Sequence, residues 1–106
     1  MALNRQPGGS AVDPERYLQQ REIIRQTATR HGATRIRLFG SVARGDAGPN
    51  SDIDVLVDLA TGRGLLDIIA IKQDLEDQLG CGVDVLTEHS LSPYLRDAVL
   101  REAVSL

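Results

Sequence analysis

The segment DIDVLVDL, residues 52–59, constrains the fold more than any other part of the chain. Successive side chains of a β-strand point to opposite faces, so alternation sorts its residues into two sets. One face carries Ile53, Val55 and Val57, and the other carries Asp52, Asp54, Leu56 and Asp58. The segment therefore predicts a strand that buries one face in a hydrophobic core and presents neighbouring carboxylates on the other.

Five further segments have the periodicity or the end signals of regular structure. They are a helix over residues 14–31, a strand over 33–40, a helix over 65–79 ended by Gly80, a strand over 81–87 and a helix over 93–104. Residues 1–12 are rich in Gly, Pro, Ser and Asn and lack an apolar period, which predicts a disordered lead-in. Residues 13–106 are expected to form a single domain.

Composition limits the classes of partner. The net charge of -3 and the pI near 5.2 argue against sequence-independent binding of DNA or RNA, which needs a concentrated basic face. The single cysteine, Cys81, cannot form an internal disulfide, and no apolar run approaches the roughly 20 residues of a membrane span. We therefore expect a cytoplasmic protein that contacts neither nucleic acid nor membrane directly.

Three aspartates form the candidate catalytic and metal-binding set. Asp52 and Asp54 lie two residues apart on one strand, so their Cα atoms are about 6.6 Å apart and their side chains point the same way. Asp84, on the strand after the long helix, faces the same way if the two strands are neighbours. Carboxylates from two strands suit Mg²⁺, and one or two such ions support nucleotidyl or phosphoryl transfer by activating a hydroxyl and neutralising a triphosphate.

The pair Gly40-Ser41 supplies a candidate phosphate site at the end of the preceding strand. Glycine allows close approach of the backbone, and amides in a turn can form an anion-binding nest to which the Ser41 hydroxyl adds a donor. Arg44 follows about one turn later and can reach the same phosphate oxygens. We interpret Gly40, Ser41 and Arg44 as nucleotide-binding residues.

Together these motifs carry a family resemblance. Gly40-Ser41, ten intervening residues and then Asp52-x-Asp54 resemble the signature of the DNA polymerase β-like nucleotidyltransferase superfamily, and GSVARGDAGPNSDIDVLV resembles its minimal nucleotidyltransferase branch. The similarity continues through GLLDIIAIKQDLEDQLGCGVDVLTE and LRDAVLREAV, so it covers residues 33–104. The fold that it implies is α/β (α+β), a small mixed β-sheet flanked by helices.

The resemblance also implies an activity and a partner. Asp52 and Asp54 would bind divalent metal, two Mg²⁺ ions in all. Asp84 would complete the site and help to activate the acceptor, and Gly40-Ser41 would bind the phosphates of ATP. Members of this branch serve as antitoxins encoded beside a HEPN ribonuclease toxin, in type VII toxin-antitoxin pairs. The chain would then transfer AMP to a tyrosine hydroxyl of that toxin and form a hetero-oligomer with it.

Two other functions remain compatible with the same residues. An antitoxin could neutralise its partner by binding alone, through the apolar edges of its helices, and a nucleotidyltransferase could modify a small molecule such as an aminoglycoside. The charged residues of the segment 72–77 are interpreted as an ordinary solvated helix face.

Overall fold

The structure, a computed structural model, describes residues 14–40 and 52–106. Its elements are α1 (Pro14–Arg30), β1 (Ala33–Phe39), β2 (Ile53–Leu59), α3 (Leu65–Leu79), β3 (Val83–Leu86), η1 (Glu88–Ser90), α4 (Pro93–Glu102) and β4 (Val104–Ser105). The predicted order of helices and strands is confirmed, with the short 3-10 helix η1 and the strand β4 added. The predicted lead-in, residues 1–12, lies outside the described residues.

The strands of the described residues form one mixed sheet in the order β3-β2-β1-β4, as the predicted fold class requires. β2 occupies an inner position, antiparallel to β1 on one side and parallel to β3 on the other. A parallel neighbour needs a long crossover, and α3 provides it between β2 and β3. This topology places residues from three separate segments around the first residues of β2.

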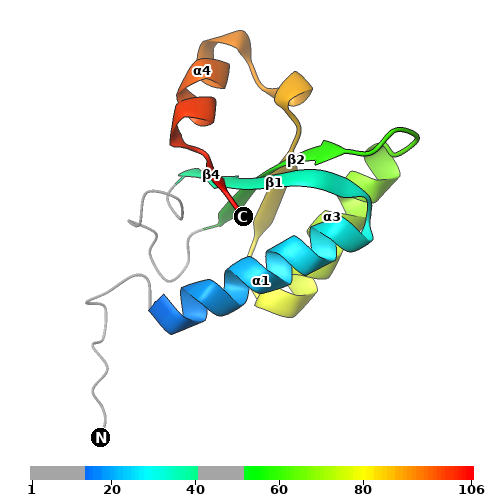
Figure 1. Ribbon diagram of the computed structural model, residues 1–106, viewed down its shortest axis with the longest axis vertical. Coiled ribbons are helices and arrows are strands. Elements are labelled where there is room, and N and C mark those ends of the chain that lie inside the picture. The colour runs from blue at the N-terminus through cyan, green and yellow to red at the C-terminus, as the bar shows by residue number, and fades with distance from the viewer. Residues whose placement is uncertain (1–13, 41–51) are drawn as a thin grey trace, which may run out of the picture.

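Two helices cover one face of this sheet. Figure 1 shows α1 and α3 packed side by side against the sheet, with α4 on the opposite side. The main core lies between these two helices and the strands, and its fully buried members include Ile24, Ala28, Leu38, Val55, Val57, Ile71, Leu75 and Val83. The predicted apolar face of β2 is therefore confirmed. No helix in the described part of the chain combines the length and the hydropathy needed to cross a membrane.

The opposite face of β2 is less open than its acidic residues suggest. Leu56, which shares this face with Asp54, has no exposed surface, and Arg37 on β1 is only 5% exposed. The Arg37 guanidinium donates hydrogen bonds to Asp58 at 3.3 Å and to Glu88 of η1 at 3.4 Å. The second face thus combines a buried leucine, a buried ion-pair group and the candidate site.

The last helix is shorter than predicted. It begins as expected, since the Ser92 hydroxyl accepts a hydrogen bond from the Tyr94 amide at 3.2 Å, but it ends at Glu102 and not at residue 104. Val104 instead pairs with Leu38 in the sheet. An unpaired strand edge offers backbone hydrogen bonds that local helix propensity does not take into account.

Candidate active site

Asp54 and Asp84 lie beside each other on neighbouring strands. They are Cα partners in the parallel pairing of β2 with β3, and directly paired residues point to the same face of a sheet, on strands about 4.8 Å apart. Asp54 is half-buried and Asp84 is exposed. The structure thus brings together two acids that are 30 residues apart in the sequence.

Asp52, the third acid, is exposed at the residue before β2 and rests against Gly82. A Cβ atom on Gly82 would lie 2.5 Å from the Asp52 Oδ1 atom and 2.9 Å from its Cγ atom. The Ile53 amide donates to the Gly82 carbonyl at 3.0 Å, which holds the two segments together. Sequence reasoning did not single out Gly82, and its only sequence signal is its place two residues before Asp84.

Gly40 approaches the same acids from β1. Its φ of 76° lies in the left-handed region that favours glycine, and a Cβ atom there would lie 3.2 Å from the Asp54 Cγ atom and closer still to Oδ2. Phe39, the residue before it, is the antiparallel partner of Asp54. The glycine of the predicted phosphate site therefore abuts a predicted metal ligand, whereas Ser41 and Arg44 lie outside the described residues.

The donor set matches magnesium in its chemistry, because Mg²⁺ prefers carboxylate oxygen and is bound by one or two carboxylates together with substrate phosphates. The absence of a side chain at Gly40 and Gly82 leaves room for the carboxylates of Asp54 and Asp52, which a Cβ atom there would meet. Within residues 14–40 and 52–106, no three carboxylate, thiol or imidazole groups are close enough to hold an ion as they stand. The metal-binding role of Asp52, Asp54 and Asp84 stays a prediction.

One positive side chain faces the acids from α3. The Lys72 ammonium donates to the Glu76 carboxylate at 3.0 Å and to the Val83 carbonyl at 2.7 Å. The hydrogen bond to Glu76 raises the pKa of Lys72, and the charges of Asp84 and Asp52 add to this effect. The interpretation of residues 72–77 as an ordinary solvated face is therefore wrong for these two residues, because their distance to β3 depends on packing that helical periodicity does not reveal.

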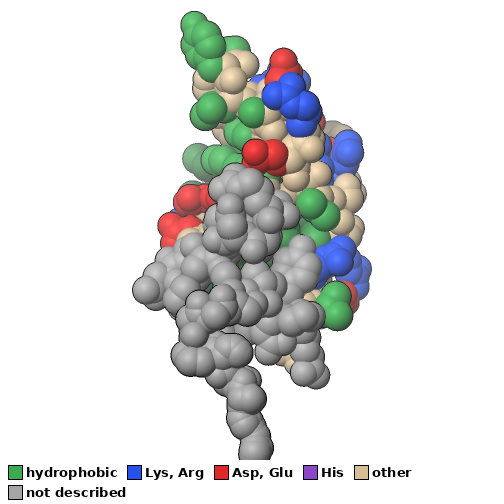
Figure 2. Space-filling view, turned by 90° about the vertical axis from the view of Figure 1, so that its left-hand side faces the viewer, with side chains coloured by type: hydrophobic (Ala, Val, Ile, Leu, Met, Phe, Trp, Pro, Cys, Tyr) green, Lys and Arg blue, Asp and Glu red, His purple; other side chains and the backbone are tan. Residues whose placement is uncertain are grey.

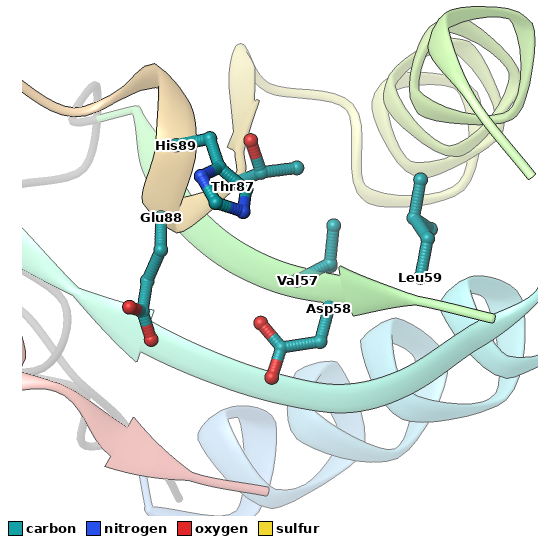
Figure 3. A pocket seen from close by; sticks show the side chains of 6 residues that line it. All are labelled: Val57, Asp58, Leu59, Thr87, Glu88 and His89. Carbon is teal, nitrogen blue, oxygen red and sulfur yellow. The ribbon is translucent and has the colours of Figure 1, made fainter. Parts of the chain in front are cut away.

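A separate hollow of about 370 Å³ lies toward the other end of β2. Figure 3 shows the six residues that line it: Val57, Asp58, Leu59, Thr87, Glu88 and His89. Its two carboxylates already share Arg37, and the pKa of Glu88 is lowered by its hydrogen bonds to Arg96 and Arg37. The hollow contains none of the predicted site residues.

Several large hydrophobic side chains are exposed on the helices. Tyr94 and Leu95, at the start of α4, are 94% and 58% exposed, and Figure 2 shows hydrophobic side chains at the upper end of the molecule, where α4 lies. A second group stands at the start of α3, where Leu65, Leu66 and Ile69 are exposed. These two groups of exposed apolar side chains lie at the starts of α4 and α3.

The mixed sheet, the paired acids Asp54 and Asp84, and Gly40 beside them agree with the nucleotidyltransferase class that the sequence predicted. The sequence profile of the nucleotidyltransferase domain family matches residues 20–106. The chain therefore belongs to this family, and it is a nucleotidyltransferase.

Known relatives indicate which branch of the nucleotidyltransferase family this chain resembles. A provisionally named protein adenylyltransferase of Methanocaldococcus jannaschii is 47% identical over 77 residues, which cover 73% of this chain and 83% of that protein. The protein adenylyltransferase MntA of Thermococcus cleftensis is 41% identical over 75 residues, covering 71% and 76%. A solved structure, described provisionally as a minimal nucleotidyltransferase, is 49% identical with a TM-score of 0.79 and covers 92% of this chain and 100% of that one. The resemblance to the minimal branch is confirmed.

Proposed function

We propose that this nucleotidyltransferase is an antitoxin that transfers AMP from ATP, with Mg²⁺, to a tyrosine hydroxyl of a HEPN-type ribonuclease toxin. The observation that carries the proposal is the pairing of Asp54 with Asp84 across two parallel strands, with Gly40 against the Asp54 carboxylate. A turn that can approach phosphate and acids that can approach a metal meet there at one point of the sheet.

The relatives support the choice of reaction and partner. Two curated relatives, 47% and 41% identical to this chain, are named protein adenylyltransferases, the first of them provisionally. A structure that shares 27% identity and a TM-score of 0.69 with this chain is a toxin-antitoxin complex with AMP-PNP, an ATP analogue; the match covers 79% of this chain and 69% of that one. These names support transfer of an adenylyl group to a protein.

In the proposed reaction, the tyrosine oxygen attacks the α-phosphorus of ATP and the bond from that phosphorus to the bridging oxygen of the β-phosphate breaks. Pyrophosphate leaves, and the Asp84 carboxylate accepts the hydroxyl proton. Asp52, Asp54 and Asp84 would hold the metal, and Gly40, Ser41 and Arg44 would hold the phosphates. The chemistry that bound Mg²⁺ supplies is neutralisation of the triphosphate and a lowered pKa of the attacking hydroxyl.

A protein acceptor fits the surface of the molecule better than a small one does. The exposed hydrophobic side chains of α3 and α4 include Leu66, at 81% exposure, and Tyr94, at 94%. Burying such side chains against a partner gives about 1.5–3 kcal/mol for each. The hollow beside η1 is lined by none of Asp52, Asp54 and Asp84.

The test combines the purified protein with ATP, Mg²⁺ and the protein encoded by the neighbouring reading frame, followed by intact mass spectrometry of both proteins. We expect AMP on the partner, and a loss of its ribonuclease activity in proportion. The double variant Asp52→Ala with Asp54→Ala should transfer nothing. Asp77→Asn, which removes an exposed acid from α3, is the matched control and should transfer at the wild-type rate.

Other results would support the alternatives. Full neutralisation of the partner by the double variant, with no change of mass on either protein, would replace transfer by binding as the mechanism. AMP found on an aminoglycoside in a parallel reaction, with none on the partner protein, would identify a small-molecule acceptor.

A further inference from the structure

Lys72 and Glu76 hold both backbone polar groups of the first residue of β3. The two side chains lie one turn apart on α3, where positions i and i+4 share a face. The Lys72 ammonium donates to the Val83 carbonyl at 2.7 Å, and the Val83 amide donates to the Glu76 carboxylate at 3.0 Å. The same carboxylate oxygen accepts from Lys72 at 3.0 Å, so the three residues form one closed cluster.

This cluster forms the backbone hydrogen bonds that a neighbouring strand would otherwise form with Val83. Within residues 14–40 and 52–106, β3 is an edge strand with β2 as its only neighbour in the sheet. On the β2 side the Gly82 carbonyl accepts from the Ile53 amide, and the amide and carbonyl of Val83 point to the other side, where the described part of the chain places no strand. Unpaired backbone groups at a strand edge are costly if they are shielded from water. The side chains of α3 satisfy these two groups in place of a strand.

The position of the cluster connects it with the candidate active site. Val83 is followed directly by Asp84, the cross-strand partner of Asp54. β3 has four residues, so a shift at its first residue moves the whole strand. The charges of Asp84 and Asp52 contribute to the raised pKa of Lys72, after the larger effect of Glu76. The Lys72 ammonium, which bonds to the Val83 carbonyl, is held at the residue next to Asp84.

We propose that Lys72 and Glu76 are positioning residues that fix the start of β3 and thereby hold Asp84 opposite Asp54. The expected effect on AMP transfer rests on the proposed function, whereas the positioning of β3 does not depend on it. Lys72 is the only lysine among the 12 basic residues of the chain. Its ammonium reaches a carbonyl and a carboxylate together.

The first test needs no transfer activity. Amide hydrogen exchange is measured residue by residue in the full chain for the wild type and for Glu76→Ala. Loss of the hydrogen bond to Val83 should speed exchange of the Val83 amide about tenfold, and should also speed exchange of the Asp84 amide. Asp77→Ala, the next residue of α3, is the control and should leave both rates unchanged. A Val83 rate within about twofold of wild type in Glu76→Ala would overturn the proposal.

The second test measures transfer of AMP. Lys72→Met should lower kcat about tenfold while leaving the KM for ATP within about twofold, because a displaced Asp84 affects the chemical step more than nucleotide binding. Lys72→Arg keeps the positive charge and should restore most of the lost kcat. If Lys72→Met acted only through a packing defect, Lys72→Arg would not restore kcat. Wild-type kcat in Lys72→Met would contradict the positioning role. A wild-type protein that transfers nothing, while its Val83 amide still responds to Glu76→Ala, would refute the proposed function and leave the cluster intact.

Discussion

Gly40 lies against the carboxylate of Asp54, with its backbone in the left-handed region at a φ of 76°. We predict that Gly40→Ala destabilises the fold by about 1–2 kcal/mol, the cost of this backbone conformation for a residue with a Cβ atom. The added methyl group also displaces Asp54, so transfer should fall by about 100-fold. Urea unfolding and single-turnover transfer measure the two effects; wild-type transfer in this variant would show that Gly40 does not shape the site.

Gly82 offers a cleaner separation of activity from stability, because its φ is not positive. A methyl group there would lie 2.5 Å from the Asp52 Oδ1 atom and must push this exposed carboxylate aside. We expect Gly82→Ala to lower the transfer rate by about 10- to 100-fold with little change in melting temperature. Gly64→Ala is the matched control, since a Cβ atom at Gly64 meets nothing within 4 Å. Equal activity of the two variants would contradict the prediction.

Arg37 is expected to contribute to stability and not to transfer. Its side chain is 6% exposed and bonds to Asp58 and Glu88, whose side chains are 40% and 28% exposed. Arg37→Met should destabilise the fold by about 2 kcal/mol, less than the loss of a fully buried pair because the two carboxylates keep contact with water. Arg25→Met, which removes an exposed ion pair with Glu22, should change the free energy of unfolding by less than about 0.5 kcal/mol. Urea unfolding of both variants tests this contrast.

Acid should weaken the fold through Glu76 and Glu88. The Val83 amide lowers the pKa of Glu76, with a further contribution from Lys72, and Arg96 and Arg37 lower the pKa of Glu88. A lowered folded-state pKa gives stability that is present above the unfolded value of 4.5 and is lost as the pH falls through the folded value. Melting temperature should therefore fall below pH 4.5, and less steeply in Glu76→Gln than in wild type.

The sequence was sufficient for the parts of the site that follow from strand alternation. Residues 52–59 predicted the buried face of β2, and Gly40 was identified from its place at a strand end, whereas the shared direction of Asp52 and Asp54 stays a prediction. Local pattern could not reveal the roles of Gly82 and Lys72, because each depends on a partner in another element. Leu56 illustrates the same limit, since its burial on the acidic face depends on segments that are distant in the sequence.

β4 was missed for a related reason. Its two residues follow α4 after a single intervening residue, Ala103, and Leu38 at the edge of β1 gives Val104 its partner. The local sequence around Val104 indicates only its helix propensity. It does not reveal that a distant strand is available for pairing.

The central place of β2 has a consequence for how activity is gained and lost. Gly40 comes from the antiparallel neighbour, Gly82 and Asp84 from the parallel one, and Asp52 and Asp54 from the strand between them. A growing chain therefore cannot assemble these groups until residue 84 has been made and α3 has folded back over the sheet. The proposed active site therefore requires all three strands to be in place.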